Sequence, residues 1–180
     1  GVSRAKDRPG LQVAIDEAVR YDRKCLVEAA VPRAREIEVS VLGNDDPSVS
    51  VPGEIIPSRE FYSYEAKYLD GTSALLIPAP ISAEETEKIQ ALAMEVYRVV
   101  DCAGMARVDF LMDGNSGGIY VNELNTIPGF TDISMYAKLW EASGVPYNVL
   151  IDRLIALAIE RHNDKARSSK VYLGRALGGD

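Results

Sequence analysis

One segment constrains the possible fold and function of this chain more than any other. It is a short predicted hairpin, in which two apolar runs flank a glycine-rich turn. Residues 105–112 form the first run and contain Asp109. In the returning run, residues 119–125, Glu123 and Asn125 lie two positions apart and therefore share one face of a strand. Opposite Asp109, they would bring together two carboxylates and an amide, oxygen ligands that Mg²⁺ favours together with substrate phosphates. The hairpin thus predicts the outline of a magnesium–nucleotide site.

The same pattern also has a purely structural interpretation. Acids at strand ends are often solvated or paired with a neighbouring base, and Arg107 lies two positions before Asp109. A plain ion pair between these two side chains would then account for the acid. The spacing by itself leaves both interpretations open.

Composition and charge exclude several classes of protein. The chain has 180 residues, 47% hydrophobic and 26% charged, which suits one sizeable core or a domain with part of another. A net charge of −7 argues against a nucleic-acid partner. No apolar run approaches the ~20 residues that span a bilayer, and no signal-peptide pattern opens the sequence. We therefore expect no membrane partner and a cytoplasmic location. Cys25 and Cys102 are too isolated for a disulfide framework or a zinc site and are expected to be reduced core residues.

The hydrophobic periodicity predicts strands interleaved with helices and hairpins, which is a mixed α/β (α+β) fold. Predicted strands, besides the hairpin, cover residues 3–6, 24–31, 36–42, 48–51 and 74–77. Predicted helices cover residues 11–21, 83–100 behind a Ser82–Glu85 capping box, 134–142 and 147–162. In the strand at 36–42 the alternation predicts one buried apolar face and one polar face. Residues 56–73 have no clear period and are expected to be a lid or disordered, and residues from 163 on a loose tail.

Four motifs, in order along the chain, carry a resemblance to a known family. They are Val51-Pro52-Gly53-Glu54-Ile55, the run at 60–68 that ends in Glu65-Ala66-Lys67-Tyr68, Ala106-Arg107-Val108-Asp109, and the segment at 125–136. Together they closely resemble the D-alanine–D-alanine ligases of the ATP-grasp superfamily, from Gly1 to about Arg161. Because Gly1-Val2-Ser3 corresponds to the end of a family loop, the chain resembles the C-terminal portion of the longer enzyme.

The resemblance implies a domain organisation. It implies an ATP-grasp C-terminal catalytic domain at residues 32–164, with a mixed or antiparallel sheet flanked by helices. Residues 1–31 would be the end of the central ATP-grasp subdomain, and residues 165–180 a tail.

The resemblance also implies an activity. The family joins two D-alanines at the expense of ATP through an acyl phosphate, for peptidoglycan precursors, and family members are commonly homodimers. The expected cofactors and substrates are ATP, D-alanine and Mg²⁺, with two ions and Mn²⁺ as a substitute. Segments that complete the family's site lie upstream of this sequence, so the isolated chain is expected to bind ATP weakly and to be inactive.

The resemblance assigns roles to individual residues as well. Asp109, Glu123 and Asn125 would ligate the metal, and Arg107 would hold the transferring phosphate. Lys67 would reach a phosphate from the long loop and Tyr68 would face the substrate. The Gly129 N–H would stabilise an oxyanion, and Ser134 with the Met135 N–H would hold the second D-alanine's carboxylate. The nucleotide would further contact Glu28, Ala29, Val31, Glu36, Asn122 and Glu123.

Several alternatives stay open. The acceptor could be D-lactate or D-serine, although such relatives generally lack the Glu-Ala-Lys-Tyr motif. Another ATP-grasp carboxylate–amine ligase would share the metal ligands but not the segment from Thr131 to Tyr136. The chain could also be a non-catalytic nucleotide-binding fragment. His162, the single histidine, is expected to lie on the surface.

Overall fold

The computed structural model describes residues 1–56, 74–131 and 134–167. The chain divides into two compact units, residues 1–31 and a second unit that begins at Pro32, and each is described by itself. The assignment of these units to ATP-grasp subdomains stays a prediction.

The first unit is built around one helix, α1 (Arg8–Ala18). Asp7 caps it by accepting a hydrogen bond from the Gly10 N–H at 2.8 Å, and Pro9 lies in the first turn. The helix therefore begins about one turn before the predicted start at residue 11. The strands predicted at residues 3–6 and 24–31 are wrong. Both segments are irregular, because this unit contains no neighbouring strand with which they could form a hydrogen-bonded ladder.

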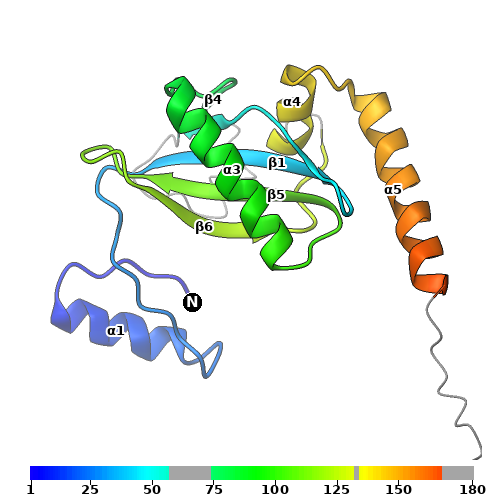
Figure 1. Ribbon diagram of the computed structural model, residues 1–180. Coiled ribbons are helices and arrows are strands. Elements are labelled where there is room, and N and C mark those ends of the chain that lie inside the picture. The colour runs from blue at the N-terminus through cyan, green and yellow to red at the C-terminus, as the bar shows by residue number, and fades with distance from the viewer. Residues whose placement is uncertain (57–73, 132–133, 168–180) are drawn as a thin grey trace, which may run out of the picture. The chain divides into compact units, whose positions relative to one another are not determined.

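The second unit is a six-stranded antiparallel sheet flanked by helices, as predicted (Figure 1). Its main path runs β4-β3-β1-β5-β6, and β2 pairs with β1. The strands are β1 (Arg35–Gly43), β2 (Ser48–Val49), β3 (Gly53–Ile56), β4 (Ala74–Leu76), β5 (Gly104–Met112) and β6 (Ile119–Asn125). β3 was not predicted as a strand, because Pro52 and Gly53 interrupt its pattern. The central pair, β1 and β5, lies in register along its whole length.

Helix α3 (Ala83–Val99) crosses one face of the sheet (Figure 1). Ile37 and Val39 of β1, together with Val108 of β5, form the core of that face with Ile89 and Tyr97 of α3. The alternating apolar residues of β1 thus produce the buried face that the sequence predicts.

Helix α4 (Met135–Ala142) covers the other face, which corrects the predicted polar surface of β1. Leu42 packs with Tyr136 and Trp140, and the buried Ser40 hydroxyl donates to the Tyr136 carbonyl at 3.2 Å. Glu38 is only 4% exposed. A strand with both faces covered can retain polar side chains only if they find partners, so these residues mark a polar site inside the fold.

Helix α5 (Tyr147–Arg167) is longer than predicted, because residues 163–167 continue it instead of starting a tail. His162 is exposed on α5, as predicted. Both cysteines are free, as predicted, and each is partly buried, with Cys102 packed against the core on the α3 side of the sheet. In the part of the chain that the structure describes, no single helix is long and apolar enough to cross a membrane. Helices α4 and α5 reach that length and hydropathy only when they are taken together, and the pair is bent by 106°.

The capping box at α3 leads to a first prediction. Ser82 accepts from the Glu85 N–H at 3.2 Å and donates its own N–H to the Glu85 carboxylate at 2.7 Å, which lowers the pKa of that carboxyl. We expect Ser82→Ala to lower the free energy of unfolding by about 1 kcal/mol in urea titrations at pH 7. A depressed pKa adds stability above the usual carboxyl pKa of ~4.3 and loses it as the pH falls through the lowered value. Glu85→Gln removes this titrating group while Ser82 keeps its backbone N–H, so the stability deficit of Glu85→Gln relative to the unchanged chain should shrink below about pH 4, and a constant deficit would contradict the role of Glu85.

Candidate active site

Two rows of polar side chains cross the face of the sheet opposite α3. The strand register aligns three residues in each row, one each from β1, β5 and β6. The first row is Glu38, Asp109 and Glu123, and the second is Ser40, Arg107 and Asn125. Because directly opposed residues of an antiparallel ladder share a face, the register alone gathers these groups. Three of the residues predicted from the hairpin thus meet Arg107 on one surface.

A β-bulge in β6 adjusts this arrangement. Asp109 pairs with Glu123, but the next residue, Phe110, pairs with Val121, so Asn122 is the extra residue of the bulge. Val121 therefore lies on the α3 face with Phe110, and Glu123 lies on the face of Asp109. A strictly alternating strand would place Val121 and Glu123 on the same side, so the bulge is what separates them. The predicted nucleotide role of Asn122 remains a prediction.

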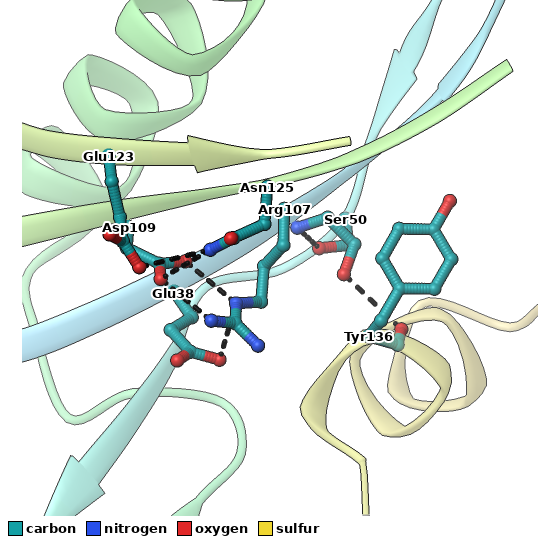
Figure 2. A network of polar contacts seen from close by, with 8 residues as sticks. Glu38, Ser50, Arg107, Asp109, Glu123, Asn125 and Tyr136 are labelled. Atoms are coloured by element: carbon teal, nitrogen blue, oxygen red, sulfur yellow. Dashed lines mark hydrogen bonds and ion pairs between the residues drawn. The ribbon is translucent and has the colours of Figure 1, made fainter. Parts of the chain in front are cut away.

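Arg107 is the centre of the polar cluster (Figure 2). Its Nε and Nη2 donate to the two oxygens of Asp109, each at 2.7 Å, and its Nε also lies 3.0 Å from Oε2 of Glu38. The ion pair that the structural interpretation expected is therefore present. Asp109 is 7% exposed, so the guanidinium offsets the high cost of burying two carboxylates. An ion pair and a functional site are compatible here, because the pair holds both charged groups in place.

Asn125 links the two acids of the hairpin. Its Nδ2 donates to Oδ2 of Asp109 at 3.2 Å and to Oε1 of Glu123 at 3.1 Å. The Asn125 amide is therefore within hydrogen-bonding distance of both carboxylates and links them. Their oxygens suit a hard divalent cation, and ligation by Asn125 would require its amide to turn so that the oxygen faces the acids. Among the residues that the structure describes, no three Asp, Glu, His or Cys side chains form a metal cluster. The metal ligands predicted from the sequence are two carboxylates and one amide, and these oxygen donors are of the kind that Mg²⁺ prefers.

Helix α4 is anchored beside the cluster by its first turn. The Tyr136 hydroxyl donates to the Val41 carbonyl at 3.0 Å, and the Ser40 hydroxyl donates to the Tyr136 carbonyl. Burial raises the pKa of Tyr136 far above its usual range, so this hydroxyl stays protonated and keeps its hydrogen bond. The start of α4 is thereby fixed over the row that contains Arg107.

The turn before α4 brings Gly129 and Ser134 together. Ser134 precedes the helix, but its hydroxyl accepts from the Thr131 N–H at 2.9 Å and contacts the Thr131 hydroxyl at 2.9 Å. Its side chain makes no capping hydrogen bond to the helix. A Cβ added at Gly129 would lie 3.1 Å from the Ser134 Oγ, closer than most Cβ contacts. The side chain of Met135 is buried with Ile55, which leaves its backbone N–H as the group relevant to a ligand.

The other predicted site residues divide into three groups. Glu36 lies on β1 opposite Leu111, on the same face as Asp109. The positions of Glu28, Ala29 and Val31 are in the first unit, whose placement relative to the sheet is not described. Lys67 and Tyr68 lie outside the described residues.

Glu38 is the site residue that sequence reasoning missed. It was expected on a solvated face, yet it is buried next to Arg107. The alternation of Ile37, Val39 and Val41 placed it opposite the core but could not show that a second layer covers it.

Comparison with known proteins decides the family. Residues 1–156 match the model of the family described as "D-ala D-ala ligase C-terminus". The chain belongs to the D-Ala–D-Ala ligase family. A D-alanine–D-alanine ligase of Caldicellulosiruptor bescii is 60% identical over 165 residues, which are 92% of this chain and 45% of that protein. The chain thus spans about half the length of the curated D-alanine–D-alanine ligases that it matches.

Solved structures of this ligase family have the same fold. The D-alanine–D-alanine ligase from Coxiella burnetii superimposes with a TM-score of 0.79 at 42% identity, over 91% of this chain and 42% of that one. The VanG D-Ala:D-Ser ligase from Enterococcus faecalis gives a TM-score of 0.73 at 36% identity, over 84% and 43%. These matches confirm the predicted ATP-grasp fold class, and one of them is a ligase that uses a different second amino acid.

Proposed function

We propose that this chain is the catalytic C-terminal portion of an ATP-dependent ligase that joins two D-alanines into D-alanyl-D-alanine for peptidoglycan precursors. The observation that carries the proposal is the hydrogen-bonded cluster of Arg107, Asp109, Glu123 and Asn125 on one face of the sheet, which extends from the buried Asp109 to the exposed Glu123. Membership of the D-Ala–D-Ala ligase family supports it.

In the proposed reaction, one D-alanine carboxylate attacks the γ-phosphorus of ATP, which gives an acyl phosphate and ADP. The amine of the second D-alanine then attacks the acyl carbon and loses a proton, and inorganic phosphate leaves.

Arg107 has the chemistry to manage the negative charge of the first step. Two anions, a carboxylate and a phosphate, must approach each other, so a fixed positive charge lowers the barrier. The planar fork of a guanidinium matches phosphate oxygens as well as carboxylates. Its bonds to Asp109 hold it on β5, and we propose that it binds the transferring phosphoryl group.

Asp109, Glu123 and Asn125 would hold Mg²⁺, or Mn²⁺ in its place. The ion supplies neutralisation of the nucleotide phosphates when it is bound. The ordering of the three ligands by the β5–β6 register and by the Asn125 hydrogen bonds supports this role. The number of ions, proposed as two, follows the family resemblance.

The turn before α4 would receive the second D-alanine. We propose that the Gly129 N–H stabilises the oxyanion of the tetrahedral intermediate, because a glycine permits close approach of a ligand to the backbone. Ser134 and the Met135 N–H would bind the D-alanine carboxylate at the beginning of α4. The short distance between Gly129 and Ser134 supports a shared task.

The nucleotide would be held by Glu36 near the ribose and by backbone groups of Glu28, Ala29 and Val31 near the adenine, with Asn122 and Glu123 toward the phosphates. Lys67 and Tyr68 would close over the phosphates and substrate. For the complete protein we propose a cytoplasmic homodimer, in line with the family. Light scattering of that protein during size-exclusion chromatography tests the dimer.

A substitution at Gly129 tests the acceptor side. We expect Gly129→Ala to lower turnover about tenfold or more and to raise the KM for the second D-alanine, because the new methyl group displaces the Ser134 hydroxyl. Gly118→Ala, in the hairpin turn, is the matched control, since its Cβ would meet only the end of the Tyr120 ring. Equal kinetics for the two variants would argue against an acceptor site at this turn.

The proposed function is tested with the protein from the complete gene. Phosphate release from ATP is measured with D-alanine, D-lactate, D-serine or no acceptor, and the products are separated by chromatography. Release that requires D-alanine, with D-alanyl-D-alanine as product, is the expected result. ATP binding without release under any condition would show that the proposed activity is wrong.

A second acceptor is favoured by one observation, the similarity to the VanG D-Ala:D-Ser ligase at 36% identity. A mixed product from D-alanine and D-serine in the same assay would establish this alternative. The Glu65-Ala66-Lys67-Tyr68 motif makes D-alanine the primary proposal.

A further inference from the structure

Glu38 shares an arginine with the proposed metal ligand Asp109. It lies directly opposite Asp109 in the β1–β5 register, and its Oε2 is 3.0 Å from the same Arg107 Nε that contacts Asp109 at 2.7 Å. Figure 2 shows the Arg107 side chain between the two acids. The cluster thus contains two carboxylates that can hold one guanidinium.

This sharing matters because the bonds of Asp109 to Arg107 compete with metal ligation. Both Asp109 oxygens accept hydrogen bonds from Arg107, and one accepts a further bond from Asn125. A carboxylate that ligates a divalent cation directs its oxygens at the ion, and a guanidinium on the same oxygens repels that ion. Arg107 must therefore give up part of its contact with Asp109. A buried arginine that lost its carboxylate without a replacement would be strongly destabilising.

The charges of the cluster indicate the replacement. Glu38, Asp109 and Glu123 carry three negative charges and Arg107 carries one positive charge. The net negative charge of the four groups therefore balances the positive charge of one divalent cation. Without Glu38, the same cation would leave an excess positive charge beside a mostly buried arginine.

We propose that Glu38 is a positioning residue that takes over Arg107 when Asp109 binds the divalent cation. This inference rests on the proposed function, because the cation is the one assigned to the nucleotide site. Glu38 thus keeps the guanidinium on the site face while Asp109 exchanges a guanidinium for an ion. Its loss leaves Arg107 on Asp109 and weakens cation binding without removing any cation ligand.

The test compares two buried acids on opposite faces of one sheet. Glu54 is also 4% exposed and is bound by Arg35 through two contacts of 2.7 Å, on the face covered by α3.

Glu38→Gln and Glu54→Gln are made in the protein from the complete gene. Mn²⁺ binding is measured by electron paramagnetic resonance of the free ion, with a saturating non-hydrolysable ATP analogue. We expect the Kd for Mn²⁺ to rise about tenfold or more in Glu38→Gln. The Glu54→Gln value should stay within about twofold of the unchanged protein.

Repeating the Glu38→Gln substitution in a variant that lacks Arg107 distinguishes a positioning role of Glu38 from a direct electrostatic effect of its carboxylate on the cation. In Arg107→Met, the added Glu38→Gln change should leave the Mn²⁺ Kd unaltered, because no guanidinium remains to be held. A tenfold effect that persists in this background, or an equal effect of Glu54→Gln, would overturn the proposal. If Glu38→Gln loses its near-ultraviolet circular dichroism, Glu38→Asp replaces it. Its shorter carboxylate should give an intermediate Kd, and an unchanged Kd would count against the proposal.

The same experiment distinguishes this inference from the proposed function. Mn²⁺ binding that Asp109→Asn does not weaken would overturn the metal assignment, and the role of Glu38 with it. Mn²⁺ binding at Asp109 without D-alanyl-D-alanine synthesis would overturn only the proposed reaction, and the Glu38 comparison would remain decisive.

Discussion

Asp109→Asn is expected to reduce ligase turnover by about 10³-fold or more in the protein from the complete gene. The substitution preserves shape but removes the negative charge of a side chain that the structure places between Arg107 and Asn125. A neutral amide is a weak ligand for a hard cation and offers Arg107 one acceptor oxygen in place of two. Turnover is measured as D-alanine-dependent phosphate release.

The control for this variant is Asp113→Asn in the turn of the same hairpin. Asp113 accepts from the Asn115 N–H at 2.7 Å and from the Ser116 hydroxyl at 2.8 Å, which lowers the pKa of its carboxyl, and it lies away from the cluster. We expect its turnover to stay within about twofold of the unchanged protein, because surface substitutions have small effects. Near-normal turnover in Asp109→Asn would refute the assignment of this carboxylate to the metal site.

Arg107→Met should affect both stability and activity. It leaves Glu38 and Asp109 buried without the guanidinium that both contact, so we expect the free energy of unfolding to fall by about 3–5 kcal/mol. Turnover should fall by about 10³-fold or more, because the charge that neutralises the transferring phosphate is gone. Urea titration and phosphate release measure the two effects separately.

Arg35→Met is the matched control on the α3 face. Arg35 binds Glu54 through the same two-pronged contact, but its side chain is 31% exposed. Arg35→Met leaves one buried carboxylate without its guanidinium and Arg107→Met leaves two, so the stability loss should be smaller, at about 2–3 kcal/mol. Its turnover should be nearly unchanged. Equal turnover losses for the two arginine variants would mean that the effect arises from a general loosening of the sheet.

Local sequence patterns were sufficient for much of the fold. The Ser82–Glu85 capping box marked the start of α3, and the turn at residues 113–118 marked the β5–β6 hairpin. These features depend on residues within a few positions of one another, so a single sequence contains the required information. The motif from Ala106 to Asp109 and the segment at 125–136 indicated the family for the same reason, and the match to the family model confirmed it.

The errors occurred where a long-range partner decides the structure. The segment at 24–31 is rich in apolar residues but has no neighbouring strand in its unit, so it does not form a strand. Cys25 lies in that segment and is only partly buried for the same reason. The bulge at Asn122 depends on how β6 aligns with β5, and strict alternation within β6 could not reveal it.

The sequence by itself determined the chemical groups of the candidate site and their local order, because residues two apart on a strand share a face. It therefore placed Glu123 with Asn125 and placed Arg107 with Asp109. Only the tertiary structure brought Glu38 to the same arginine, because that contact requires β1 to pair with β5 in one particular register. Only the packing of α4 buried the polar side chains of β1 on this face, since burial depends on the layer that covers a strand and not on the alternation within it.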